Sequence, residues 1–76
     1  MNEKNFDHIL LFKTNIKTKR DIKKIAPILT VQKEIIKWNV DLHDNDRVLR
    51  IISTGIKNEQ IVDLLQSIGY ACSELE

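Results

Sequence analysis

Five cationic side chains surround a Thr-x-x-Asp motif near the start of this 76-residue chain. The motif is formed by Thr18 and Asp21, and the cations are Lys17, Lys19, Arg20, Lys23 and Lys24. Thr-x-x-Asp resembles a helix capping box, in which the hydroxyl accepts a hydrogen bond from the third helical N–H and the carboxylate accepts one from the cap residue. The cations could bind an anion or an acidic protein surface, since N-terminal backbone N–H groups and fixed positive charges would converge there. A solvated helix face is the alternative interpretation of the same cations.

The remaining residues that could do chemistry are scattered. His8 and His43 are far apart in the sequence, and the run from His43 to Asp46 has the composition of a turn and lacks the length of a calcium loop. Cys72 has no cysteine or histidine at ligand spacing, so we expect a small buried residue rather than a nucleophile. The pattern therefore predicts no catalytic residue, no metal ligand and no cofactor, and we expect the protein not to be an enzyme.

Hydrophobic periodicity predicts six elements that would position these residues. Residues 8–16 form a strand with Leu10, Phe12, Thr14 and Ile16 on one face, and a helix follows with Ile22, Ile25, Ala26 and Leu29 on its buried side. We expect Pro27 to kink or shorten this helix. Residues 35–42 form a second strand, with Ile36, Trp38, Val40 and Leu42 on one face.

The second half of the chain contains a further strand, a helix and a last strand. A polar turn at residues 43–46 joins the second strand to a third, at residues 47–53, in an antiparallel hairpin. A second helix follows, with Asn58 as its N-cap and Gly69 as its left-handed C-terminal stop. Residues 70–75 form a short last strand. The sequence therefore predicts an α+β, ferredoxin-like βαββαβ sandwich, with a four-stranded antiparallel sheet and two helices on one face.

Five short segments together resemble the heavy-metal-associated domains, a family that includes copper chaperones. They are Phe-Lys-Thr-Asn-Ile at 12–16, Ile-Ala-Pro-Ile-Leu at 25–29, Trp-Asn-Val-Asp-Leu at 38–42, Asp-Arg-Val-Leu at 46–49 and Ile-Gly-Tyr at 68–70. In that family the loop after the first strand carries Cys-x-x-Cys, whose two thiolates hold Cu(I). The resemblance implies that Thr18 and Asp21 occupy the two cysteine positions, and that Tyr70 packs beside this loop.

A hydroxyl and a carboxylate are hard ligands, which do not replace two thiolates for Cu(I). We therefore expect that binding of soft metal, Cu(I) or Zn(II), has been lost, that a helix cap has taken its place, and that the protein is a non-enzymatic interaction module. The five cations would be its docking surface for an acidic protein partner. Two alternatives stay open: a residual metal-binding or metal-trafficking protein with a non-standard site, and a small-molecule-binding regulatory domain of the same fold.

Composition sets the remaining expectations. The formal net charge of +1 argues against a dedicated nucleic-acid binder, and Trp38 shares a face with Val40 and Leu42, so we expect it in the core rather than on an RNA-stacking surface. A single cysteine suits a reducing compartment, and the apolar runs are too short to span a membrane. We expect a soluble, cytoplasmic, single-domain protein over residues 1–76, with a polar lead-in at 1–7, as a monomer or a weak homodimer.

Overall fold

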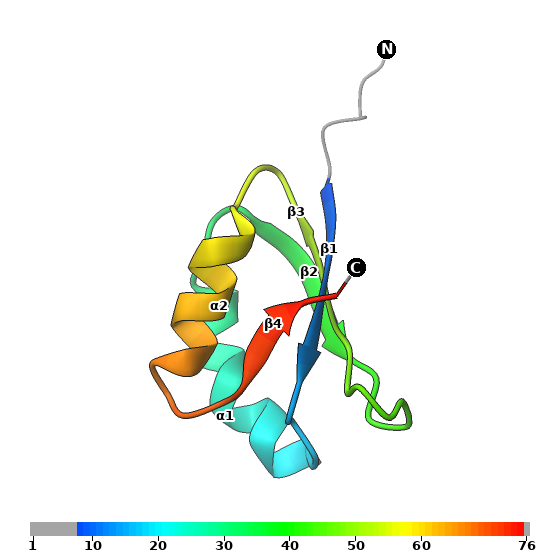
Figure 1. Cartoon of the computed structure of the whole chain (residues 1–76). Helices are drawn as coiled ribbons and strands as arrows, with labels where there is room; N and C mark the ends of the chain where they lie inside the picture. Colours follow the sequence, from blue (N-terminus) through cyan, green and yellow to red (C-terminus); the bar gives the residue numbers. More distant parts are fainter. Residues whose placement is uncertain (1–7, 76) are drawn as a thin grey trace.

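The elements follow one another in the order strand, helix, strand, strand, helix, strand (Figure 1). They are β1 (His8–Thr14), α1 (Lys19–Thr30), β2 (Ile35–Val40), β3 (Leu49–Ser53), α2 (Asn58–Gln66) and β4 (Cys72–Glu74). This computed structural model describes residues 8–75, so the lead-in expected at residues 1–7 lies outside the described residues.

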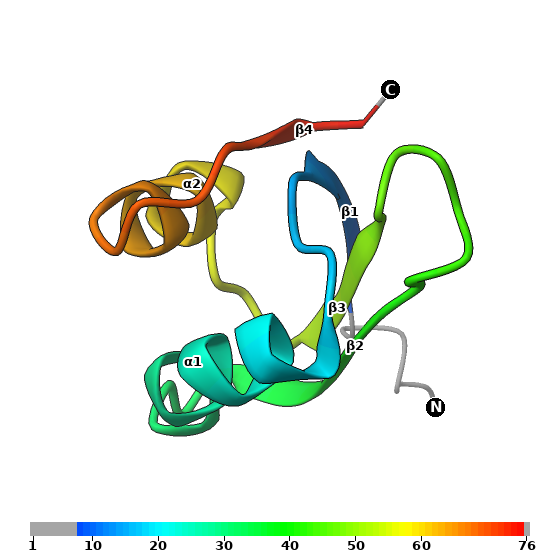
Figure 2. The ribbon, with the colours of Figure 1, turned by 90° about the horizontal axis from the view of Figure 1, so that it is seen from below.

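The four strands form one antiparallel sheet in the order β2-β3-β1-β4. In the central pair Leu10 lies opposite Ile51 and Phe12 opposite Leu49, while Thr14 at the end of β1 pairs with Cys72 of β4. Both helices lie on the same side of this sheet (Figure 2). The ferredoxin-like architecture predicted from the order of the elements is therefore confirmed.

The core lies between the sheet and the helices. Phe12, Leu49 and Ile51 point into it from the central strands, and Ile25 and Leu29 of α1 and Ile61 and Leu65 of α2 fill it from the other side. The period-two pattern of β1 correctly assigns its buried face, although the strand ends at Thr14 and Ile16 reaches the core from the following loop. Trp38 packs against this core, as its shared face with Val40 predicts.

Pro27 does not end α1, so of the two effects expected of it, a kink or a shorter helix, the shorter helix is wrong. The helix continues to Thr30. A proline removes the hydrogen bond to the carbonyl four residues earlier, which here belongs to Lys23. Both Pro27 and Lys23 are exposed, so water can donate a hydrogen bond to that carbonyl, and the helix continues past Pro27.

The predicted face of β2 is wrong at Ile36, whose side chain is 53% exposed. The cause is a β-bulge, which shifts the pairing with β3 between Ile35 and Lys37. An extra residue in one strand turns the side chains before it to the opposite face of the sheet. Ile35 therefore packs against the core in place of Ile36, while Trp38 and Val40 keep the predicted orientation.

The connection between β2 and β3 is longer than the predicted turn at residues 43–46. The strands pair antiparallel as expected, but β2 ends at Val40 and β3 begins at Leu49. We call the intervening residues 41–48 the β2–β3 loop. It closes with a 2.9 Å hydrogen bond from the N–H of Asp41 to the carbonyl of Val48.

Helix α2 begins differently from the prediction and ends as predicted. Lys57 is its N-cap residue, and the side chain of Gln60 accepts the Lys57 N–H at 3.0 Å. Asn58 is instead the first helical residue and donates to the carboxylate of Glu74 at 2.6 Å. Gly69 has φ of 92°, the left-handed conformation expected of a C-terminal stop. β4 lies within the strand predicted at residues 70–75 but is shorter, Cys72–Glu74. Neither helix of the described chain has the length and apolar character needed to cross a membrane.

Candidate functional site

The loop between β1 and α1 ends in a complete capping box. The hydroxyl of Thr18 accepts a hydrogen bond from the N–H of Asp21 at 3.2 Å, and the carboxylate of Asp21 accepts one from the N–H of Thr18 at 3.2 Å. Thr18 is extended, with φ of −134° and ψ of 167°, as an N-cap residue should be. The capping box predicted from Thr-x-x-Asp is therefore confirmed, although aspartate is shorter than the usual glutamate.

The carboxylate of Asp21 has two further partners. Its Oδ2 also accepts the N–H of Lys17 at 3.0 Å, and its Oδ1 accepts the hydroxyl of Tyr70 at 2.8 Å. Tyr70 lies just before β4 and comes to the first turn of α1 from the far end of the chain. Both oxygens of Asp21 thus accept hydrogen bonds within the protein.

These hydrogen bonds stabilise the ionised form of Asp21. The N–H of Lys17 contributes most, followed by the hydroxyl of Tyr70, and together with Thr18 they lower the pKa of Asp21 from 3.8 to about 2. Burial, together with the nearby Asp21 charge, raises the pKa of Tyr70. At neutral pH the pair is therefore a phenol donating to a carboxylate.

The five predicted docking cations, Lys17, Lys19, Arg20, Lys23 and Lys24, are all exposed. We call them the α1 cation cluster. Lys19 and Arg20 are the first two residues of α1, where the helix dipole disfavours positive charge, and Lys23 and Lys24 lie one turn further on. The N–H groups of Lys17, Thr18 and Asp21 are already bonded within the loop. An anion would therefore meet the side chains of this cluster rather than those three backbone groups.

The β2–β3 loop is attached to the same region through Arg47. Its Nη1 donates to the carbonyl of Lys17 at 3.2 Å, and its own carbonyl accepts the hydroxyl of Thr14 at 2.6 Å. Arg47 has φ of 47°, a left-handed conformation that costs about 1–2 kcal/mol for a residue with a Cβ. These contacts hold the residue in this conformation and link the two loops.

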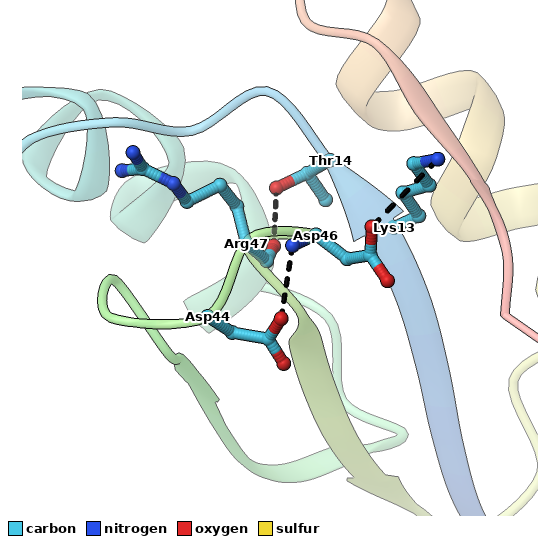
Figure 3. A network of polar contacts seen from close by, with 5 residues as sticks. All are labelled: Lys13, Thr14, Asp44, Asp46 and Arg47. Atoms are coloured by element: carbon cyan, nitrogen blue, oxygen red, sulfur yellow. Dashed lines mark hydrogen bonds and ion pairs between the residues drawn. The ribbon is translucent and has the colours of Figure 1, made fainter.

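Asp46 and Asp44 complete this network (Figure 3). The carbonyl of Asp46 accepts the N–H of Thr14 at 3.0 Å, and its carboxylate lies 3.7 Å from the ammonium of Lys13. The carboxylate of Asp44 accepts the N–H of Asp46 at 2.9 Å. The acidic residues of this loop therefore have structural partners, in agreement with the turn interpretation of residues 43–46.

The two histidines lie at opposite ends of β1. His8 pairs with Ser53 at the start of the strand, whereas His43 belongs to the loop that contacts Thr14 at its end. Within residues 8–75, no three side chains among His, Cys, Asp and Glu are arranged to hold a metal ion. Cys72 is buried beside the core, as expected, and burial raises the pKa of its thiol to about 11.

Sequence patterns did not reveal two features of this region. The left-handed backbone of Arg47 has no local signal, because arginine is not a typical left-handed residue. The resemblance placed Tyr70 beside the loop, where the structure has it, but it did not indicate the hydrogen bond to Asp21, which joins residues 49 positions apart.

The comparisons with known proteins identify the fold. No protein-family model matches the chain, and no curated protein matches its sequence. Among solved structures, the crystal structure of oxidized MerP from Ralstonia metallidurans CH34 superimposes with a TM-score of 0.76. The match covers 92% of this chain and 99% of the MerP chain at 8% sequence identity. The chain therefore has the ferredoxin-like fold seen in MerP.

Proposed function

We propose that this protein is a non-enzymatic interaction module of the heavy-metal-associated fold, whose metal loop has become a helix cap and whose α1 cation cluster binds an acidic protein surface. The observation that carries the proposal is the hydrogen bonding of both carboxylate oxygens of Asp21. Both of its oxygens accept hydrogen bonds from Lys17, Thr18 or Tyr70. A metal bound to this carboxylate would compete with these donors for its lone pairs.

The chemistry of the two loop residues supports the same proposal. Soft ions such as Cu(I) prefer thiolates, whereas Thr18 and Asp21 offer a hydroxyl and a carboxylate. The one thiol of the chain, Cys72, is buried in β4 and its raised pKa keeps it protonated at neutral pH. A cysteine binds a metal ion as its thiolate, so Cys72 is a poor substitute for a pair of cysteines in the loop.

The placement of the α1 cation cluster supports a role in binding. Lys19 precedes Lys23, and Arg20 precedes Lys24, by four residues, so like charges are neighbours on the helix surface and repel one another. Lys19 and Arg20 also oppose the helix dipole. The α1 cation cluster therefore lowers the stability of α1. Attraction of an acidic partner is a role that would explain this cost.

A peptide titration tests this proposal. A synthetic 12-residue peptide of Glu, Ser and Gly, without apolar residues, is added to the ¹⁵N-labelled protein at low and at high salt. We expect amide shifts concentrated at residues 17–24, and an affinity that falls as salt screens the charges. The double variant Lys19→Glu/Arg20→Glu should lose most of this binding and most of its salt dependence.

The matched control is Lys33→Glu/Lys57→Glu, which changes the net charge equally. Lys57 is the N-cap residue of α2, and α2 begins at the opposite end of the molecule from the start of α1 (Figure 1). The control should bind the peptide nearly as well as the unmodified protein. Lys19→Glu/Arg20→Glu should also be more stable than wild type, by about 0.3–1 kcal/mol per site, because negative charge is favourable at the start of a helix. Its loss of binding could therefore not be attributed to unfolding. Equal binding by both variants would contradict the proposal.

A further inference from the structure

Strand β2 forms the longer of the two edges of the sheet. The strand order is β2-β3-β1-β4, so within residues 8–75 both β2 and β4 pair with another strand on one side alone. β4 has three residues, Cys72–Glu74, whereas β2 has six, Ile35–Val40. Proteins often protect a sheet edge by keeping the edge strand short, and a longer edge can pair with a strand of another chain. β2 is therefore the edge at which such pairing is expected.

The pairing of β2 with β3 shows which backbone groups of β2 point outward. The N–H of Asp41 donates to the carbonyl of Val48 at 2.9 Å, so the backbone of Asp41 faces β3. In an antiparallel pair, residues whose N–H and C=O face the partner strand alternate with residues whose groups face away. Along the regular register from Asp41 back to Asn39, the backbone groups of Val40 and Trp38 therefore face away from β3. Among residues 8–75, no loop hydrogen-bonds to these outward groups.

The side chains along this edge carry one cation and one anion, placed symmetrically. Lys37 and Asp41 are exposed, and the exposed Asn39 lies midway between them. These three side chains share one side of the strand, because successive side chains of a strand point to opposite sides. Trp38 and Val40 lie on the other side, half-buried against the core. The edge is therefore self-complementary in charge about Asn39.

The charged groups beside this edge are also balanced. Arg50 of β3 is exposed and lies opposite Asn39, and Asp44 belongs to the β2–β3 loop. The carboxylates of Asp41 and Asp44 each accept one backbone N–H of that loop, which leaves lone pairs for a further donor. A surface with both signs of charge fits a second copy of itself better than a partner that is purely acidic or purely basic.

Two-fold symmetry restricts how β2 can pair with itself. Outward-facing residues must lie opposite outward-facing residues of the second copy, so the axis passes through a residue of the strand. An axis at Lys37 would oppose two lysines, and an axis at Trp38 or Val40 would oppose Asn39 to Lys37 or to Asp41. An axis at Asn39 places Lys37 opposite Asp41 and Trp38 opposite Val40, twice each. Opposite charges, and an aromatic residue with a β-branched one, are both stabilising cross-strand pairs.

We propose that β2 pairs antiparallel with β2 of a second copy of this chain, about a two-fold axis at Asn39, so that one sheet continues through both copies. Trp38 and Val40 of each copy exchange main-chain hydrogen bonds with Val40 and Trp38 of the other. Lys37 of each copy forms an ion pair with Asp41 of the other. The α1 cation cluster takes no part in this contact, so the proposal goes beyond the function proposed above and does not depend on it.

A charge exchange between Lys37 and Asp41 tests the proposed register. In sedimentation equilibrium from about 10 µM to about 1 mM, wild type should show a reversible monomer–dimer equilibrium. Lys37→Asp and Asp41→Lys should each weaken dimerisation by about tenfold, because each variant opposes like charges at both ends of the contact. An equimolar mixture of the two variants should form a mixed dimer about as tight as the wild-type dimer, since opposite charges then meet again.

The matched control is Lys57→Asp, which makes the same charge change as Lys37→Asp but lies at the N-cap of α2. It should dimerise like wild type. Recovery of the dimer in the mixture also shows that both single variants are folded, because only a folded β2 edge can pair.

Amide hydrogen exchange locates the contact on the strand. The N–H groups of Trp38 and Val40 should be protected at about 1 mM and should exchange faster on dilution to about 50 µM. Those of Asn39 and Asp41 face β3 and should stay protected at both concentrations.

Three results would overturn the proposal. The first is a protein that stays monomeric up to about 1 mM. The second is a dimer in which the N–H groups of Trp38 and Val40 exchange as fast as in the dilute sample, which would place the contact elsewhere. The third is a mixture of Lys37→Asp and Asp41→Lys that dimerises no better than either variant alone, which would exclude the axis at Asn39.

Discussion

The hydroxyl of Tyr70 donates a 2.8 Å hydrogen bond to the carboxylate of Asp21, joining the segment before β4 to the first turn of α1. The same carboxylate accepts the N–H groups of Lys17 and Thr18. One aspartate thus caps the helix and also connects it to the segment before β4. Asp21 therefore has a structural role in this protein.

Tyr70→Phe should weaken this connection without removing the ring. The loss of the phenol donor leaves the ionised carboxylate with fewer hydrogen bonds, so the pKa of Asp21 should rise from about 2 toward its ordinary value of 3.8. The carboxyl ¹³C shift of Asp21, followed by NMR across an acid titration, measures this directly. An unchanged pKa in Tyr70→Phe would show that the two side chains are not bonded in solution.

Thr18→Ala should destabilise the protein by about 1 kcal/mol, because the first turn of α1 loses the hydroxyl that accepts the N–H of Asp21. Urea unfolding followed by circular dichroism gives the difference. Thr18→Ser, which keeps the hydroxyl, is the matched control and should stay close to wild type. If the alanine variant were as stable as the serine variant, the cap would contribute nothing.

The depressed pKa of Asp21 predicts how stability depends on pH. Its folded-state pKa of about 2 lies below its ordinary value of 3.8. The ionised group therefore stabilises the folded state above about pH 4, and this contribution is lost as the pH falls toward 2. The difference in unfolding free energy between wild type and Asp21→Asn should shrink over this window and stay constant above it. A difference that is independent of pH from 2 to 6 would be inconsistent with the ionised cap.

Cys72 should react slowly in the folded protein. Its side chain is 5% exposed, and burial raises the pKa of the thiol to about 11, so little thiolate is present at pH 8. Reaction with a thiol-specific disulfide reagent should be much slower in buffer than in denaturing urea. Similar rates in the two conditions would mean that β4 opens readily.

The elements that local patterns encode were predictable from the sequence. The period-two alternation in β1 and the apolar stripe of α1 specify which faces are buried, and the order of strands and helices specifies the ferredoxin-like fold. The capping box at Thr18 and Asp21 was predictable for the same reason, since both of its partners lie within one helical turn.

Features that depend on pairing between distant segments were not predictable. The bulge in β2 is set by the register with β3, and it turns Ile36 outward although its own alternation matches the neighbouring residues. Arg47 takes up its left-handed conformation because Thr14 and Lys17 hold it there. Asn58 is a good cap by composition, but the carboxylate of Glu74 engages its side chain instead.

The central claim is that residues 17–22, at the start of α1, act as a helix cap and not as a soft-metal site. Native mass spectrometry under reducing conditions, with Cu(I), Zn(II) and Ni(II) offered separately, tests it most directly. Thr18→Cys/Asp21→Cys introduces two thiols at the spacing that suits Cu(I) and serves as the positive control. We predict that this variant retains one Cu(I), whereas wild type retains no ion stoichiometrically. Tight 1:1 retention of any one of the three ions by wild type would contradict the account.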